Sequence, residues 1–207
     1  MPQTTTNLRD AIRLLFILIH GSEPITDHPD GYTRKFEGKA KVFAMDFWVR
    51  YPDFLAYELL NRFEATNERR YLDLAKDIFD KEEPDLRSIP MIRYRFGAYE
   101  DLTETLALLK TKGLIFEDGD KSNGLIQQCI YYVTPLCEEV LEDIRNESSL
   151  LGWYDDRALL VREICGNYRG SQLKDEQYKH MVYASTKFGG VIPSIKQDVL
   201  QRLNKFN

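Results

Sequence analysis

The sequence lacks the features of membrane-spanning, disulfide-rich and disordered proteins. Its longest apolar run, Leu14 to Ile19, is too short for a membrane span or a signal-peptide core, and no cationic leader precedes it. The only cysteines, Cys129, Cys137 and Cys165, have neither the spacing of a zinc site nor the even number of a disulfide framework. With 12 Gly and 8 Pro in 207 residues, the chain is neither collagen-like nor of low complexity. These absences predict a soluble, cytoplasmic protein in a reducing compartment.

Catalytic and cofactor-binding motifs are also missing. The three histidines show no paired ligand spacing, and the sequence contains no Gly-x-Ser-x-Gly, no His-Glu-x-x-His and no complete phosphate-binding loop. Pro29-Asp30 followed by Glu37-Gly38-Lys39 formally matches a metal-dependent nuclease motif. That chemistry needs an apolar hairpin to fix its carboxylates, whereas this segment is polar and basic. We therefore expect no catalytic residue, no cofactor and no metal site.

What the sequence does contain is enough apolar residues for a packed core, with a slight excess of acid. Hydrophobic residues make up 43%, charged residues 29%, and the formal net charge is −5. The length suits one ordinary domain or a domain with appendages. The mild acidity argues against a histone-like mode of nucleic-acid binding, which needs a cationic surface, but a local basic face stays open.

Apolar periodicity predicts a mostly helical chain. We expect helices over residues 7–20, 36–50, 52–62 and 67–80, with an elbow at Pro52, because proline fits the first turn of a helix but disfavours helical geometry in the residue before it. Residues 22–35 carry turn-forming residues and predict an exposed loop. Residues 155–180 predict one long, mostly polar helix, and 185–190 a flexible joint.

The segment 91–144 is the most informative. Leu102, Leu106 and Leu109 predict a helix that ends at Lys112-Gly113. Strand-like segments 114–117 and 126–133 flank a polar tip, which predicts a hairpin. Thr134 and Pro135 then predict the start of another helix. This order resembles the second half of a winged helix-turn-helix domain, and a generic helix-hairpin-helix is the alternative.

We therefore predict a mostly α fold with a small β-hairpin wing, a winged helix-turn-helix with helical N- and C-terminal extensions. The predicted domains are an N-terminal helix and loop (residues 1–35), a winged-helix core (36–147) and a C-terminal helical extension (148–207). In the extension, Ile195, Val199 and Leu203 form one face of a helix that begins after Ser194. This apolar face either packs on its own domain or docks on a partner.

The charges of the winged segment bear on DNA binding. Winged helices commonly read DNA with a recognition helix, supported by phosphate contacts from basic residues. Between Ala98 and Leu125, six acidic residues oppose three basic ones: Glu100, Asp101, Glu104, Glu117, Asp118 and Asp120 against Lys110, Lys112 and Lys121. A surface of that sign would repel phosphate, and it suits either solvent or a basic protein partner. Short basic runs elsewhere in the chain leave a backbone-tracking surface open.

Two segments together resemble the small middle component of ABC-three-component antiphage systems, the Lamassu type included. They are residues 41–60, with the core Met-Asp-Phe-Trp-Val-Arg-Tyr-Pro, and residues 92–115, where Arg-Tyr-Arg-Phe-Gly leads into the leucine-rich helix and Lys-Gly-Leu-Ile. Gly97 is followed by Ala98-Tyr99-Glu100, where the family pattern has Pro-Trp-Asp. The resemblance implies an accessory subunit without its own active site, between an SMC-like ABC ATPase that senses foreign DNA and an effector, commonly a nuclease.

The resemblance also suggests partner-binding residues. Arg93, Tyr94, Arg95 and Tyr99 are expected to contact a partner or to brace the winged domain, and a buried aromatic and cation–π cluster is the alternative. Ile195, Val199 and Leu203 are the second candidate set.

The function expected from this resemblance is that of a non-catalytic scaffold in bacterial antiviral defence. It would link the ATPase to the effector nuclease subunit, contact DNA indirectly through the complex and bind no membrane, and direct contact with DNA stays open. The alternative is a winged-helix transcriptional regulator, dimeric through residues 155–206, whose duplex binding depends on Lys110, Lys112 and Lys121.

Overall fold

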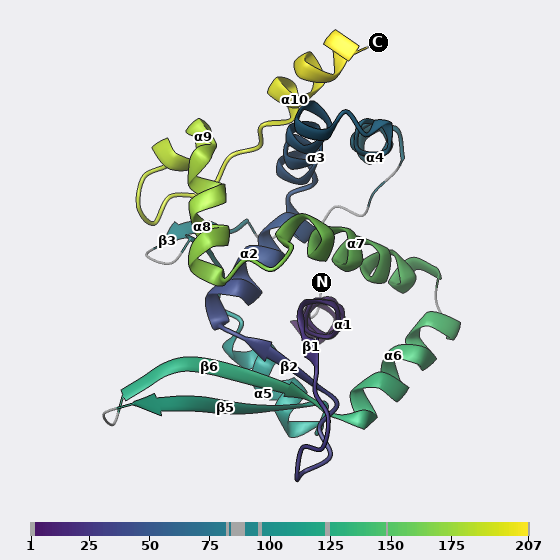
Figure 1. Ribbon diagram of the computed structural model, residues 1–207, viewed down its shortest axis with the longest axis vertical. Helices are drawn as coiled ribbons and strands as arrows, with labels where there is room; N and C mark the ends of the chain where they lie inside the picture. Colours follow the sequence, from purple (N-terminus) through teal and green to yellow (C-terminus); the bar gives the residue numbers. More distant parts are fainter. Residues whose placement is uncertain are drawn as a thin grey trace.

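The computed structural model describes residues 3–81, 83, 90–94, 97–122, 125–147 and 149–206. Within them the chain is mostly helical, with one small antiparallel sheet and a separate two-stranded hairpin (Figure 1). This confirms the predicted class at the level of helix and sheet content. No helix in this part of the chain combines the length and the apolar character that a membrane crossing requires.

Helix α1 (Gln3–Gly21) runs through the middle of the molecule. Figure 1 shows it end-on, between α7 and the sheet. Leu14, Phe16, Ile17 and Leu18 are fully buried, because α2, α5 and α7 pack around the helix. The longest apolar run of the sequence is therefore the central core helix.

The sheet has the strand order β1-β2-β6-β5, and all neighbouring strands are antiparallel. Its strands are β1 (Glu23–Pro24), β2 (Arg34–Glu37), β5 (Ile115–Ser122) and β6 (Leu125–Val133). The predicted hairpin is confirmed, but β5 continues to Ser122, so residues 118–122, expected in the tip, are strand. Figure 1 shows this hairpin extending beyond the helices.

The predicted helix start at Phe36 is wrong. Phe36 lies in β2, opposite Tyr131 of β6, and its side chain is fully buried. A four-residue strand is too short to show alternation, and helix α2 (Lys39–Arg50) follows immediately. The polar loop expected over 22–35 therefore contains β1 and the start of β2.

Helices α2, α3 (Pro52–Thr66) and α4 (Arg69–Asp80) follow the prediction closely. The elbow at Tyr51 is confirmed, with Pro52 in the first turn of α3. Every residue of α2 from Lys41 to Arg50 is buried. A short hairpin of β3 (Ile92–Tyr94) and β4 (Gly97–Tyr99) follows, which the sequence did not predict.

The helix before the wing, α5 (Thr103–Thr111), ends as predicted, and Gly113 has a φ of +70° that suits glycine. Helix α6 (Pro135–Glu147) also begins as predicted: the Thr134 hydroxyl accepts a hydrogen bond from the Cys137 amide at 3.3 Å.

The predicted long polar helix over 155–180 is wrong. The chain forms two helices, α7 (Ser149–Cys165) and α8 (Gly170–Lys179). Gly166, which follows α7, has a φ of +52°, and the chain leaves the helical conformation there. Helix α7 buries Tyr154, Ala158 and Val161 against the core. Short helices α9 (Met181–Ser185) and α10 (Lys196–Leu203) and a final 3₁₀ turn (Asn204–Phe206) complete the chain. All three predicted segments contribute to one hydrophobic core.

A charged network inside the core joins α1, α2 and the segment before α5. Arg13 donates from Nε to Asp46 at 2.6 Å and also pairs with Asp10. Arg50 pairs with Asp46 at 3.4 Å and with Glu100. Burial by itself would lower the pKa of Arg13, but Asp46 and Asp10 hold it above its ordinary value. The network fixes the start of α5 relative to the two core helices.

Candidate partner interface

The β3–β4 hairpin is held against the segment that follows α9. The Arg93 amide donates to the Gly190 carbonyl at 2.9 Å, and the Arg93 carbonyl accepts from the Gly189 amide at 2.8 Å. The Arg93 guanidinium donates to the Tyr178 hydroxyl at 3.2 Å, lies 5.0 Å from the centre of that ring and also binds the Thr186 carbonyl. Arg93 therefore links the β3–β4 hairpin to α8 and to the segment after α9.

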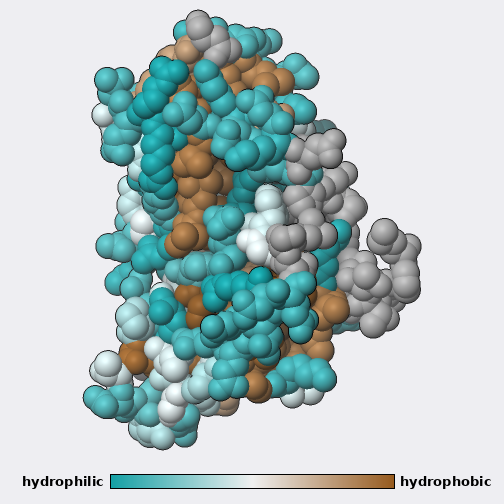
Figure 2. Space-filling model, turned by 90° about the vertical axis from the view of Figure 1, so that its right-hand side faces the viewer, coloured by the Kyte–Doolittle hydropathy of each residue, from teal (hydrophilic) through white to brown (hydrophobic). Residues whose placement is uncertain are grey.

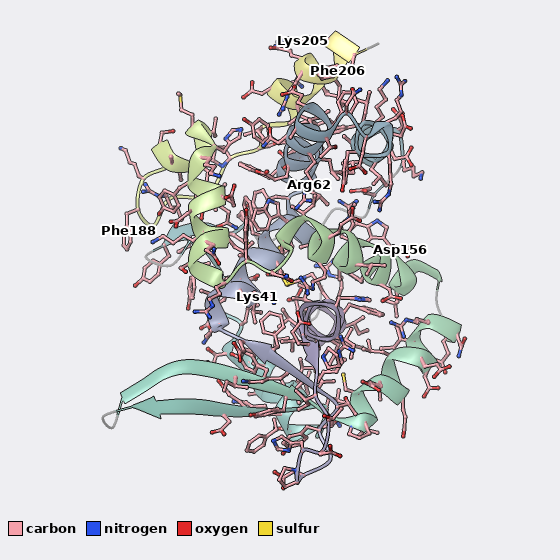
Figure 3. All side chains as sticks on the ribbon, in the orientation of Figure 1. Lys41, Arg62, Asp156, Phe188, Lys205 and Phe206 are labelled. Atoms are coloured by element: carbon pink, nitrogen blue, oxygen red, sulfur yellow. The ribbon has the colours of Figure 1, made fainter. Side chains whose placement is uncertain are left out.

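A line of aromatic rings leads from the core to the surface beside this link. Between ring centres, Phe43 of α2 lies 5.2 Å from Tyr99. Tyr99 lies 5.3 Å from Tyr94, and Tyr94 lies 5.0 Å from Phe188. Tyr94 is 41% exposed and Phe188 is 66% exposed. Figure 3 shows Phe188 at the margin of the molecule, beyond α8. We call Tyr94, Phe188 and the exposed Val191, which bridges to Ile92, the hairpin patch.

The hairpin patch contains one of the four residues that the family resemblance suggested. Tyr94 is at the surface, Tyr99 is half-buried behind it, and Arg95 lies outside the described residues. The sequence did not indicate Phe188 or Val191, since both are far from Tyr94 along the chain. The one available signal was an aromatic residue beside Gly189-Gly190 in a segment expected to be a flexible joint.

The second candidate set is not on the surface. Ile195, Val199 and Leu203 are all buried, because α10 packs on α3. Asp53 of α3 accepts hydrogen bonds from the Ile195 amide at 2.8 Å and the Ser194 hydroxyl at 2.6 Å, so α3 also secures the start of α10. Of the two alternatives for this apolar face, the structure shows that it packs on its own chain. The expectation that these three residues bind a partner is therefore wrong.

The surface around α5 is less acidic than the sequence count suggested. Glu100 is turned inward to Arg50, and Glu117 pairs with Lys110 at 2.5 Å. Lys112 is exposed at the end of α5, and the side chain of Lys121 lies outside the described part of β5. Asp101 and Glu104 are the exposed acids at the start of the helix. Among its described side chains the face of α5 is nearly neutral rather than acidic, and they form no cationic cluster of the kind that phosphate contacts need.

Several titratable side chains that could take part in chemistry are paired or buried. Burial raises the pKa of Cys137 to about 12 and that of Cys165 to about 12. The His20 ring contacts Asp155 at 2.5 Å, and burial against Phe54 and Tyr57 lowers the pKa of His180. Among the described residues, no group of three His, Cys, Asp or Glu side chains could hold a metal ion.

A cleft of about 450 Å³ opens between α4 and α7. On this side of the molecule, apolar side chains gather in a strip bordered by hydrophilic ones (Figure 2). Arg157 lies 4.9 Å from the ring centre of Trp153 and pairs with Glu83. The lining acids Asp77 and Glu163 are paired with Lys81 and Arg70. Asp156 is a further lining acid, so the cleft is a concave surface that carries both paired charges and an additional carboxylate.

The chain matches no protein-family model, no curated protein and no solved structure.

Proposed function

We propose that this protein is a winged-helix accessory subunit of an SMC-like ATPase complex in bacterial antiviral defence. It holds the ATPase and an effector nuclease together in the cytoplasm and has no active site of its own. The family resemblance of residues 41–60 and 92–115 motivates the partners, and the topology of the chain supports the fold.

The strand order is the observation that supports the winged-helix part of the proposal. In a winged helix, one helix precedes the first strand, two helices lie between the first and second strands, and the third strand pairs with both of the others. Here α1, β2, α2, α5, β5 and β6 follow that order, and β6 lies between β2 and β5. Helices α3 and α4 and the β3–β4 hairpin form an insertion between α2 and α5. In this arrangement α1 is part of the core rather than an extension.

The surfaces support a scaffold better than a DNA reader. The ammonium of Lys110 on α5 is bound to Glu117, so this helix offers little charge for phosphate. The insertion instead carries Tyr94, which together with Phe188 exposes adjoining rings at the surface. Exposed aromatic residues are enriched in protein–protein interfaces. We assign the hairpin patch to one of the two protein partners.

A scaffold of this kind acts through the states of its partners. Nucleotide and DNA would change the conformation of the ATPase, and the subunit would transmit that change by releasing or reorienting the effector. The buried network joins α1, α2 and the start of α5, and through these elements the subunit would transmit the change.

The transcriptional regulator remains the second candidate, because the same strand order suits it and Lys112 is exposed at the end of α5. Segment 155–206, its proposed dimer interface, buries Val161, Leu173 and Val199 in the chain's own core but exposes Leu159, Met181 and Phe188 at the surface. The regulator predicts duplex binding that is lost when Lys110, Lys112 and Lys121 become alanine, whereas the scaffold proposal predicts no such loss.

The hairpin patch is tested by the double variant Tyr94→Ala, Phe188→Ala in co-expression with the neighbouring gene products and a pull-down through one tag. We expect loss of one partner with unchanged thermal unfolding. Leu8→Ala on α1 is the matched control, because it removes an apolar side chain that is 59% exposed elsewhere. Retention of every partner by the double variant would contradict the assignment of the patch.

A further inference from the structure

Four aromatic rings lie side by side on the outer face of the sheet. Tyr32 stacks on Tyr132 at 5.2 Å and on Phe116 at 5.6 Å between ring centres, with interplanar angles of 22° and 16°. His28 lies 4.7 Å from Tyr32 and 4.8 Å from Tyr132. Phe116 is 48% exposed, and the other three rings are partly exposed. We call these four residues the aromatic shelf.

The register of the strands explains why the rings share one face. Tyr132 pairs with Phe116 on one side and with Lys35 on the other, so the three side chains form one row across β2, β6 and β5. The next row on the same face is Glu37, Ile130 and Asp118. The opposite face carries Phe36 and Tyr131, which are buried in the core. The shelf is therefore the solvent side of the sheet.

Acidic side chains surround the shelf. Asp118 follows Phe116 on the same face, and Asp30 lies 3.9 Å from the His28 ring. Burial raises the pKa of Tyr32, and the carboxylates of Asp30 and Asp118 raise it further, which places both acids within electrostatic reach of the shelf. Lys35 is the basic residue of the two rows, and its ammonium is paired with Glu37 at 2.5 Å.

We propose that the aromatic shelf binds arginine side chains of a basic segment in a protein partner. A guanidinium stacks on an aromatic face and also forms bidentate hydrogen bonds with a carboxylate, so rings flanked by acids fit it on both counts. Nucleic acid also stacks on aromatic rings, but it needs a positive groove for its phosphates, and this face is acidic. The inference goes beyond the proposed function, because it holds for any basic partner, whether or not that partner is an ATPase.

The test measures binding of a short fluorescein-labelled peptide of alternating arginine and glycine to the full chain by fluorescence anisotropy. Two variants remove the two parts of the site separately: Tyr32→Ala with Phe116→Ala, and Asp30→Asn with Asp118→Asn. The first control is Tyr168→Ala with Met181→Ala, which removes one exposed ring and one exposed apolar side chain elsewhere. The second is Glu104→Gln with Asp175→Asn, which removes the same charge from other exposed positions.

We expect each shelf variant to weaken peptide binding about tenfold and both controls to leave it unchanged. The lysine counterpart of the peptide should bind more weakly, because an ammonium has no plane to stack. Three results would each overturn the proposal. The charge control could lose as much peptide binding as the Asp-to-Asn variant, or the unaltered protein could fail to bind the peptide. A single-stranded oligonucleotide could also displace the peptide from the unaltered protein by binding a site that the shelf variants remove. The Asp-to-Asn variant changes only exposed side chains and keeps the test decisive if the ring variant fails to fold. Because the assay uses the isolated chain, a failed complex with the ATPase does not affect it.

Discussion

Asp46 is the residue whose removal should most weaken the fold. Its carboxylate is fully buried, accepts from Arg13 at 2.6 Å and pairs with Arg50 at 3.4 Å. Both arginine side chains are only 2% exposed. Asp46→Ala would leave two guanidinium groups in the core without the carboxylate they share. Asp10 and Glu100 still pair with Arg13 and Arg50, so the loss comes from buried N–H donors that no longer have an acceptor. Breaking a buried charged hydrogen bond of this kind costs about 3–5 kcal/mol.

This cost is large against the total stability of a domain, which is about 5–15 kcal/mol. With a slope of about 2 kcal/mol per molar urea, the unfolding midpoint of Asp46→Ala should fall by about 1.5–2.5 M. The assay is urea unfolding followed by circular dichroism and by tryptophan fluorescence. Because arginine keeps its proton at any ordinary pH, raising the pH should not rescue the variant.

Asp77→Ala is the matched control. It removes the partner of Lys81 at 2.7 Å from an exposed pair one turn apart on α4, and such pairs contribute at most about 0.5 kcal/mol. If the free energy of unfolding of Asp46→Ala lies within about 0.5 kcal/mol of that of the unaltered protein, the buried network does not hold α1, α2 and the start of α5 together.

Three further results are expected. Cys137 and Cys165 should stay unreactive toward Ellman's reagent in the native protein and react in urea, because burial raises each pKa to about 12; labelling of either in the native protein contradicts their burial. Leu203→Ala should lower the free energy of unfolding in urea by about 2–4 kcal/mol, since the side chain is buried against the core. A change near zero would indicate that α10 is not packed on the core and is available to a partner. Burial by itself would raise the pKa of Asp155, but hydrogen bonds from Arg145 and His20 lower it, so its stabilisation is present above its unfolded pKa and is lost as the pH falls through the folded pKa. Asp155→Asn should therefore have a lower thermal midpoint than the unaltered protein at neutral pH, and the difference should shrink in acid. A difference of the same size at every pH would show that lost packing, not the charge, lowers the midpoint.

The long periodic helices were predictable because their apolar stripes recur over three or more turns. This holds for α1, α3 and α4, and for α5 with its glycine end. Strand β2 and the β3–β4 hairpin were missed, because strands of four and three residues are too short to show a pattern. Strand β2 also pairs with β6, which is far away in the chain. The break at Gly166 was missed for a related reason, since a glycine inside a helical pattern signals an end only weakly.

The surfaces were harder to predict than the helices. The apolar face of α10 has the same sequence pattern whether it covers α3 or a partner, so only the fold decides between them. Charge counting overstated the acidity around α5, since it could not show that Glu100 points into the core. The hairpin patch and the aromatic shelf both join residues that are distant in sequence, and no local motif marks them.

The central claim is that this chain works as a subunit between an ATPase and an effector. The most direct measurement is co-expression with the neighbouring gene products, a pull-down through a single tag, and mass photometry with and without ATP and linear DNA. The account predicts a stoichiometric complex that contains a large ATPase and changes composition or mass when ATP and DNA are added. A protein recovered alone that shifts a promoter fragment through Lys110, Lys112 and Lys121 would contradict it.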